Sequence, residues 1–505
     1  MIPIYRQNDI KSIDAALASA GMLEMAIAHA GFSVFTLAIE MLGGPYGKRV
    51  AVLHGPGNNG RDGLVAAELL RGAGVSVKEV VYGGAEYSDA CTYSEMDLVI
   101  DGCFGIGLSR PFKAPPIGPE INVLAIDVPS GLAGDEGKVL GSAVKASATL
   151  CLTGIKLGVL ISHGPDLCGD IYLAELGLGD PGLTSHREYL VDDFDLAQLG
   201  NLRSRTDHKW SHSVAVIAGS PGMDGAAHLV CDSAYFMGAG IVHLYTDMGN
   251  QRGDYGVETV VHQTAFADFD EPGKRAFFHE LAHRFKSLVI GPGLGREPWM
   301  TELIEGVISC GLRTVIDADG IAAVPSIEWL ASRIASDHPG VILTPHQGEL
   351  RSLLERSGGK DAVDDLLQQN VCSFAGDFAA KSRASLLLKG GPTVVASREG
   401  ACYLTSAPSA SLAVAGSGDT LSGMLGAVLS YQGDMAKQAA ITAHLHGLAG
   451  RSLSRGLSGD LARRARDILL RFEASGKSHW NGNLQRPTQI EGNLVAGKQL
   501  VVGYH

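Results

Sequence analysis

Short runs of valine, isoleucine and leucine, most of them followed by glycine, constrain the fold of this chain more than any other feature. The first half contains "KRVAVLHG", "VSVKEVVYGG", "DLVIDGCFG", "NVLAIDVPSG" and "ATLCLTGIK", and helix-like segments such as "GLVAAELLRGAG" separate some of them. Continuous apolar strands that alternate with helices indicate a parallel sheet covered on both faces. We therefore expect an α/β fold that binds its ligands beyond the carboxyl ends of the strands, where these glycines cluster.

A second series of the same kind begins at "SVAVIAGS". It continues through "IVHLYT", "SLVIGPGLG", "RTVIDADGI", "VILTPHQGEL" and "ASLLLKGGPTVVAS", and a helical segment over about residues 418–473 follows. The charged stretch "VDDFDLAQLGNLRSRTDHKW" between the two series is interpreted as a linker. A chain of 505 residues has room for two or three domains. We place two of them at residues 1–195 and 200–475, with a polar, glycine-rich appendage at 476–505.

Composition argues against several classes of protein. A net charge of −13 leaves no basic excess to neutralise nucleic-acid phosphates. The eight cysteines include no CxxC pair, which favours free thiols in a reducing cytoplasm over a zinc site or a disulfide scaffold. The apolar stretch "GMLEMAIAHAGFSVFTLAIEML" contains three ionisable residues, so it predicts a core helix and not a membrane span. We expect a soluble, cytoplasmic protein that binds no nucleic acid and no membrane.

The loop "GPGNNG" at residues 55–60 fits the dinucleotide-binding pattern G-x-G-x-x-G between a strand and a helix. A dinucleotide fold also needs an acid at the end of the second strand, which here ends in "VVYGGAE", so a dehydrogenase is disfavoured. Polar side chains at three strand ends are more informative: Asn58, Asn59 and Asp62; Asp101; and Asp127 with Ser130. Asp62 alone could cap a helix. Carboxylates grouped at one edge require a cation, a substrate or a proton-transfer task.

The motifs "GPGNNGRDGLVAA", "DGCFGIGLSRP", "DVPSGL" and "GIKLG" resemble those of the YjeF N-terminal family, the NAD(P)H-hydrate epimerases. The resemblance covers most of residues 1–190 and implies a Rossmann-like parallel sheet. It implies a potassium ion held by Asn59, Asp101 and Ser130. It also implies that the hydrated nicotinamide nucleotide contacts Asn58, Asn59, Gly60, Arg61, Asp62, Gly105, Ile106, Gly107, Leu108, Ser109, Arg110, Pro111 and Asp127, with Asp127 as the catalytic residue.

The family usually has glycine at the position of Arg61 and threonine at that of Ile106. We expect the Arg61 side chain either to crowd the ligand or to pair with its phosphates.

In the second half, "GSGDTLSG" at residues 416–423 places one carboxylate, Asp419, among small residues that open an apolar helix. Taken alone, Asp419 could be a helix cap. No Walker A motif is present, but a phosphoryl-transfer site needs only amide groups for the transferred anion and an acceptor for the attacking hydroxyl's proton. The motif supplies both, so we interpret Asp419 as that acceptor. His444 and His446 are two positions apart, so they face different sides of a helix and are interpreted as ordinary helix residues.

This half resembles the ribokinase-like superfamily. More narrowly, "VAVIAGSPGMDGAA", "VIGPGLG", "DADGI", "TPHQGEL", "LLLKGGPTVV" and "AGSGDTLSGML" resemble the NAD(P)H-hydrate dehydratases. The resemblance implies that an adenine nucleotide, ADP or ATP with magnesium, binds Lys389, Gly390, Gly391, Pro392, Thr393 and Gly418. It also implies that the hydrate contacts Ala226, Gly293, His346 and Asp419.

Together the two resemblances imply an isomerase and a lyase in one chain. The first domain would interconvert the R and S hydrates of NADH and NADPH, the substrates NADHX and NADPHX, and the second would dehydrate the S form. The alternative is a ribokinase-type vitamin or sugar kinase whose N-terminal domain only binds ligand. A homo-oligomer is expected.

Overall fold

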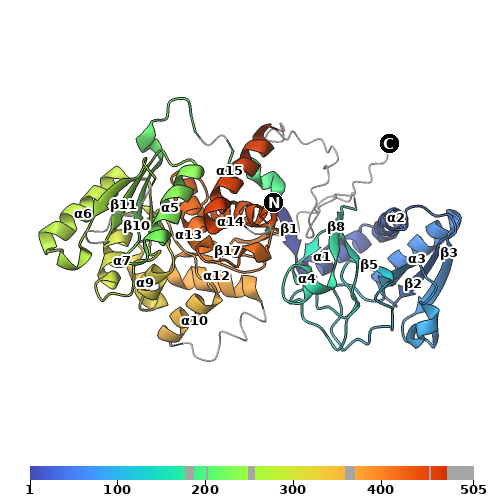
Figure 1. The fold of residues 1–505 in the computed structure, drawn as a ribbon. Coiled ribbons are helices and arrows are strands. Elements are labelled where there is room, and N and C mark those ends of the chain that lie inside the picture. The colour runs from blue at the N-terminus through green and yellow to red at the C-terminus, as the bar shows by residue number, and fades with distance from the viewer. Residues whose placement is uncertain (177–186, 201–202, 248–255, 359–369, 454–455, 475–505) are drawn as a thin grey trace. The chain divides into compact units, whose positions relative to one another are not determined.

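The computed structural model describes residues 1–176, 187–200, 203–247, 256–358, 370–453 and 456–474. The chain divides into two compact units, and the division falls between His186 and Arg187 (Figure 1). Among the described residues, the N-terminal unit comprises 2–176, and the C-terminal unit comprises Met1 and residues from 187 onward. The appendage expected at 476–505 lies outside the described residues.

The N-terminal unit is built on a six-stranded, wholly parallel sheet with the order β3-β2-β4-β5-β6-β8. Its strands are β2 (Arg49–His54), β3 (Ser76–Val81), β4 (Leu98–Gly102), β5 (Asn122–Ile126), β6 (Ala148–Leu152) and β8 (Asp170–Ala174). Its α-helices are α1 (Gln7–Ser19), α2 (Leu23–Leu42), α3 (Asn58–Gly72) and α4 (Gly164–Leu167). Two further short strands pair with each other in parallel, β1 (Ile2–Tyr5) and β7 (Ile155–Lys156).

Alternation along β2 divides the apolar side chains of this unit between the two faces of the sheet. Val50 and Val52 join the cluster formed with α2 and α3, which lie side by side in Figure 1. Ala51 and Leu53 point the other way, into a cluster with aromatic residues of the loops. Although α2 is long and apolar enough to cross a membrane, half of its most apolar window is buried inside the protein. The prediction of a core helix is therefore confirmed.

The C-terminal unit contains strands in the order β12-β11-β10-β13-β14-β15-β16-β17-β18-β9. All neighbours pair in parallel except β17, which is antiparallel to both β16 and β18. The strands are β9 (Glu188–Val191), β10 (Ser213–Ile217), β11 (Ile241–Thr246), β12 (Val260–Gln263), β13 (Ser287–Ile290), β14 (Arg313–Ile316), β15 (Val341–Leu343), β16 (Ser385–Leu388), β17 (Val394–Ala396) and β18 (Cys402–Thr405). Both β10 and β13 are buried at every position, as central parallel strands covered on both faces must be.

The helices of this unit include α5 (Asp224–Phe236), α13 (Ser417–Leu429) and α14 (Met435–Ser452), which pack on the sheet, and α15 (Ser458–Ala474), which packs on these three. The others are α6 (Glu271–Arg284), α7 (Met300–Ser309), α8 (Asp319–Ala322), α9 (Ile327–Arg333), α10 (Gln347–Arg356) and α12 (Val371–Ser382). The helical finish expected near residues 418–473 corresponds to α13, α14 and α15. The predicted α/β class with parallel sheets is confirmed.

The stretch interpreted as a linker is part of the C-terminal unit. Its first residue ends β9, which pairs with β18, and the 3-10 helix η4 (Asp193–Gln198) follows. Leu196 and Leu199 are buried in the main core of this unit. One of the charges that suggested a linker has a partner far away in sequence, because Asp193 bonds the buried His444 at 2.8 Å. This bond also accounts for His444 without a metal ion.

Candidate active sites

The first candidate site lies at the carboxyl ends of β2, β4, β5 and β6, where the sequence predicted it. The α3 helix begins at Asn58 directly after the glycine loop that follows β2. Two of the glycines in this loop are needed because other backbone atoms lie too close for a side chain. A Cβ atom on Gly60 would lie 2.1 Å from the Gly55 carbonyl oxygen, and a Cβ atom on Gly55 would lie 2.0 Å from the Cys103 carbonyl oxygen. The loop therefore holds the first turn of α3 tightly against the end of the sheet.

Two of the three predicted potassium ligands are in direct contact. Ser130 donates its hydroxyl to Asp101 Oδ1 at 2.7 Å and its backbone N–H to Asp101 Oδ2 at 2.8 Å. Asp101 is fully buried, and this burial raises the pKa of its carboxyl. Within the described residues it has no cationic side-chain partner. Asn59 uses its amide nitrogen to donate to the Ile126 carbonyl at 2.9 Å, which leaves its amide oxygen for another partner.

Asp127 follows β5 and is held in an unusual backbone conformation. Its φ of 68° is in the left-handed region, which is uncommon for residues other than glycine but which aspartate and asparagine adopt more often than most. Its Oδ1 accepts hydrogen bonds from the buried ammonium group of Lys156 and from Leu152 N. Asp127 Oδ2 and the Asn59 amide flank Gly105, because a Cβ atom there would lie 3.2 Å from the carboxylate oxygen and 3.4 Å from Asn59 Cγ. Three predicted residues from separate segments, Asn59 of α3, Gly105 and Asp127, therefore lie around this point.

Asp62 is not a helix cap. The N-cap of α3 is Gly57, and Asp62 lies in the second turn, where it is 5% exposed. Burial, followed by the charges of Asp127 and Asp14, raises the pKa of Asp62 to about 8. Arg61 points elsewhere and forms a bidentate pair with Glu24 at 2.7 Å. The sequence predicted that Arg61 would crowd the ligand or pair with its phosphates, and it did not predict this pairing with Glu24.

The loop after β4 carries the remaining predicted contacts. Ser109, Arg110 and Pro111 are exposed, and the Arg110 guanidinium lies 5.7 Å from the centre of the Phe104 ring. The Leu108 side chain is buried in the aromatic cluster, so this residue offers a ligand only its backbone. Glycines at 105 and 107 flank Ile106, whose side chain packs against Gly134.

The second candidate site lies at the carboxyl ends of the strands in the C-terminal unit. Lys389, directly after β16, bonds Asp317 Oδ1 at 2.7 Å, and Ser422 of α13 donates its hydroxyl to Asp317 Oδ2 at 2.6 Å. A Cβ atom on Gly418 would lie 3.0 Å from Lys389 Nζ. The structure thus brings together two of the predicted nucleotide-binding residues, Lys389 and Gly418.

Asp419 is in the first turn of α13 but does not cap it. The N-cap is Gly416, which has a φ of 86° and forms no side-chain cap bond. Burial, followed by the charge of Asp317, raises the pKa of Asp419 to about 6, and Lys389 opposes this rise. A carboxylate that is partly desolvated beside a helix N-terminus and a lysine is suited to proton transfer near neutral pH.

The predicted hydrate-binding residues lie on the surrounding loops. A Cβ atom on Gly293 would lie 3.0 Å from Ala226 Cβ, so these two residues are neighbours. His346 caps α10, since its Nδ1 accepts from Gly348 N at 3.0 Å and Glu349 N at 3.2 Å. It is also beside Lys389, whose backbone N–H bonds the Pro345 carbonyl at 2.9 Å. In the nucleotide loop, Thr393 donates its hydroxyl to the Gly390 carbonyl at 3.1 Å, and Gly391 and Pro392 separate the two.

Several residues of both sites were not predicted as site residues: Asp14, Lys156, Asp317, Ser422 and His446. The signal for Asp317 was present in "DADGI", a carboxylate directly after a strand. His446 was interpreted as an ordinary helix residue, yet its buried Nε2 atom has no hydrogen-bond partner in the described residues, and burial and the charge of Lys389 lower the pKa of this imidazole to about 4.

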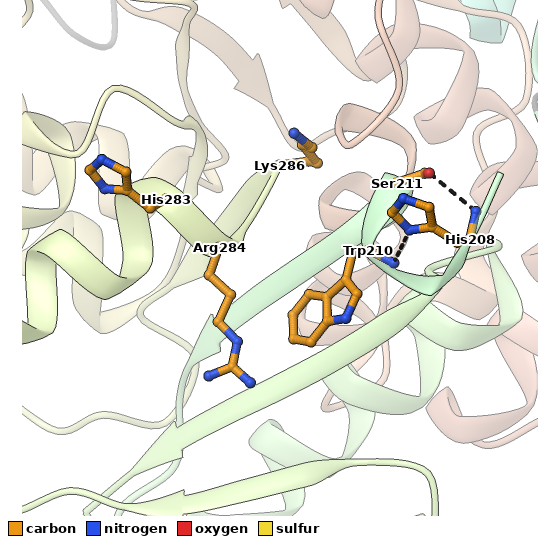
Figure 2. A pocket seen from close by; sticks show the side chains of 6 residues that line it. All are labelled: His208, Trp210, Ser211, His283, Arg284 and Lys286. Carbon is orange, nitrogen blue, oxygen red and sulfur yellow. Dashed lines mark hydrogen bonds between the residues drawn. The ribbon is translucent and has the colours of Figure 1, made fainter.

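A pocket of about 460 Å³ elsewhere in the C-terminal unit is distinct from this site. Figure 2 shows its lining: His208, Trp210, Ser211, His283, Arg284 and Lys286. These residues directly precede β10 and β13, so the pocket lies at the amino ends of the strands, whereas Lys389 and Asp419 lie at the carboxyl ends.

Two of the solved structures to which the chain is similar match slightly more than half of it. A ribokinase-like superfamily protein from Enterococcus faecalis has a TM-score of 0.48 and 19% identity, over 57% of this chain and 98% of its own. An ADP/ATP-dependent NAD(P)H-hydrate dehydratase from Bacillus subtilis, co-crystallised with ATP and Mg²⁺, has a TM-score of 0.43 and 24% identity, over 54% of this chain and 93% of its own.

Sequence comparisons cover both units. A family model described as NAD(P)H-hydrate dehydratase matches residues 214–470, and one described as YjeF-related protein N-terminus matches residues 23–94 and 80–158. A bifunctional NAD(P)H-hydrate repair enzyme from Coxiella burnetii is 30% identical, over 89% of this chain and 94% of its own length. One from Thermofilum pendens is 31% identical, over 88% and 91%. The chain therefore belongs to the family of bifunctional NAD(P)H-hydrate repair enzymes.

Proposed function

We propose that the two units divide the repair of hydrated nicotinamide nucleotides between them. The N-terminal unit interconverts the R and S hydrates of NADH and NADPH, and the C-terminal unit dehydrates the S form with ADP or ATP. The observation that carries this proposal is the presence of two separate carboxylate sites, around Asp127 and Asp419, in a chain that matches the bifunctional family over nearly its whole length. An ordinary vitamin or sugar kinase is disfavoured, because such an enzyme would not need the first site.

The dehydration follows from the chemistry of the substrate. The hydrate carries a hydroxyl on the carbon next to the ring nitrogen, and hydroxide is a poor leaving group. The hydroxyl oxygen attacks the terminal phosphorus of ADP or ATP while Asp419 accepts its proton. The bond from that phosphorus to the bridging oxygen breaks with its electron pair going to oxygen, and AMP or ADP leaves. The ring nitrogen's lone pair then expels phosphate, and loss of a proton from the adjacent carbon restores the dihydronicotinamide. Lys389 and the amides around Gly418 stabilise the charge on the transferred group.

A magnesium ion bound with the nucleotide fits the oxygen donors near Asp419. Three carboxylates interact electrostatically with that residue: Asp317, Asp319 and Glu349. Carboxylates together with nucleotide phosphates form the usual magnesium environment. When bound, the ion would neutralise charge on the phosphates.

A potassium ion fits the first site. The Asp101 carboxylate is fully buried without a cationic side-chain partner in the described residues, and an unpaired buried charge is costly. Asn59 and Ser130 add the amide and hydroxyl oxygens that a hard cation prefers. These three residues would hold the ion.

Replacing Asp101 by asparagine should therefore slow epimer exchange and remove its stimulation by potassium. Asparagine has nearly the same shape and can still accept the hydrogen bond from Ser130 N, but it lacks the charge that binds the cation. The measurement is the exchange rate without nucleotide, at increasing KCl and constant ionic strength. Full, potassium-stimulated exchange in Asp101→Asn would show that the ion is not held here.

Dehydration by the unmodified protein should accelerate as the pH rises through about 6. Asp419 can accept a proton only as a carboxylate, and its pKa of about 6 means that it is mostly protonated below that value. The turnover rate with saturating nucleotide and S hydrate should be measured between about pH 5 and 8. A flat profile across this range would contradict the assignment of Asp419 as the base.

The simplest test of the whole proposal is to incubate the protein with a mixture of R and S NADH hydrates and each adenine nucleotide. Absorbance of the dihydronicotinamide should recover completely when both units act, but only to the S fraction when the first is inactive. We further propose a cytoplasmic location, because all eight cysteines are free thiols and six are buried. A homo-oligomer is proposed as well, and light scattering would test it.

A further inference from the structure

The N-terminal site contains more ionisable groups than the predicted set. Four of them come from four elements: Asp14 from α1, Asp62 from α3, Asp127 from the end of β5 and Lys156 from β7. Three are carboxyls and only one is a cation. Arg61 of α3 is a second cation near Asp62, and its guanidinium is also paired with Glu24 at the surface.

Of the three carboxyls, the one that Lys156 contacts directly is that of Asp127. Its side chain is 1% exposed, and its ammonium group bonds Asp127 Oδ1 and the Leu152 carbonyl, the latter at 2.6 Å. A buried ammonium group in direct contact stabilises the ionised carboxylate. Lys156 therefore fixes the position of the Asp127 carboxylate in the site.

Asp62 is in the opposite situation. Its carboxyl accepts no hydrogen bond from the described residues. Burial and the like charges of Asp127 and Asp14 raise its pKa, and the charges of Arg61 and Lys156 oppose this rise without cancelling it. With its pKa raised to about 8, it holds a proton at neutral pH. Two carboxyls of one site that differ in protonation in this way are suited to act as an acid and a base.

We propose that Asp62 and Asp127 form the acid–base pair of the epimerisation and that Lys156 is a positioning residue that holds the Asp127 carboxylate in place. The proposal rests on the proposed epimerase function of this unit and assigns a proton donor to it. Asp14, which interacts with Asp62, Asp127 and the Asn58 side chain, completes the charged surroundings of the pair.

The proton balance of the reaction is as follows. Asp62 gives its proton to the hydroxyl oxygen, the carbon–oxygen bond breaks with its electron pair going to oxygen, and water leaves. The ring nitrogen's lone pair forms a double bond to the same carbon. Water then adds to the other face, the double-bond pair returns to nitrogen, and Asp127 takes the proton of the incoming water. Asp62 is now ionised and Asp127 protonated, so the reverse reaction uses the two groups in exchanged roles.

The test is the pH profile of epimer exchange, measured without nucleotide so that the second unit is idle. The unmodified protein should lose activity above about pH 8, where Asp62 ionises. Asp62→Asn should exchange the hydrates about 10²–10⁴-fold more slowly, because an amide is too weak an acid to donate the proton. The remaining rate should no longer fall above about pH 8. Asp170→Asn is the matched control: Asp170 is exposed at the amino end of β8 in the same unit and should leave the profile unchanged.

Lys156→Met should slow epimer exchange, because the Asp127 carboxylate loses the cation that holds it in place. Lys156→Arg, which keeps a cation there, should recover part of the rate, and failure of Lys156→Arg to exchange faster than Lys156→Met would contradict the positioning role. If the unmodified protein exchanges the hydrates and Asp62→Asn exchanges them at the same rate, with the same loss of rate above about pH 8, the proposed acid–base pair is wrong but the epimerase function is still supported. If the unmodified protein does not exchange them at all, the proposed function itself fails.

Discussion

Replacing Asp419 by asparagine is expected to slow dehydration by about 10²–10⁴-fold, the usual contribution of a general base. The amide keeps the shape of the side chain but cannot accept the proton of the attacking hydroxyl. Nucleotide binding should persist, because Lys389 keeps its bond to Asp317 and the amides around Gly418 are unchanged. Turnover and nucleotide affinity should both be measured, the first with the S hydrate.

Stability provides a second, independent expectation for the same variant. The pKa of Asp419 in the folded chain, about 6, is above the ordinary aspartate value of 3.8. A raised pKa means that the contribution of this group to stability is present at low pH and is lost as the pH rises through about 6. At pH 7 the charge therefore opposes folding, and Asp419→Asn should melt no lower than the unmodified protein.

A helix-capping role would give a different pattern, with near-normal turnover in Asp419→Asn and loss of stability in Asp419→Ala. The geometry already disfavours it, since Gly416 is the N-cap. Unimpaired dehydration by Asp419→Asn would rule out Asp419 as the base.

The sequence predicted those parts of both sites that follow a strand directly. Asp101, Asp127 and Lys389 each follow or end an apolar run, and parallel strands bring their carboxyl ends to one edge. Lys156 could not be placed in this way, because it follows a short turn after β6 and its role depends on burial against Asp127. Asp14 was missed for a similar reason, since its helix α1 lies far from the other motifs in sequence.

Local charge misled the interpretation of residues 191–210. A charged stretch between two apolar series resembles a linker, but Asp193 pairs with the buried His444 and two leucines of the stretch enter the core. Sequence patterns report which residues are polar and not whether a distant partner satisfies them. Strand β8 was not anticipated, although its "DIYLA" pairs in parallel with β6 as an edge strand.

Asp127→Asn should abolish epimer exchange, with a loss of at least about 10²-fold, while dehydration of the S hydrate in the other unit continues at its normal rate. Asparagine tolerates the left-handed φ of 68° as well as aspartate does, so the backbone should be kept. The measurement is exchange without nucleotide, followed by dehydration of purified S hydrate with nucleotide.

This variant also leaves the ammonium group of Lys156 buried without a carboxylate, and breaking a buried pair costs about 3–5 kcal/mol. The first unit could then lose exchange by unfolding and not by losing a base. The double variant Asp127→Asn/Lys156→Met separates the two causes, because methionine removes the unpaired charge and fills a similar volume. It should recover most of the thermal stability but none of the exchange. Recovery of exchange in the double variant would mean that Asp127 serves only to pair with Lys156, and another group would have to be the base.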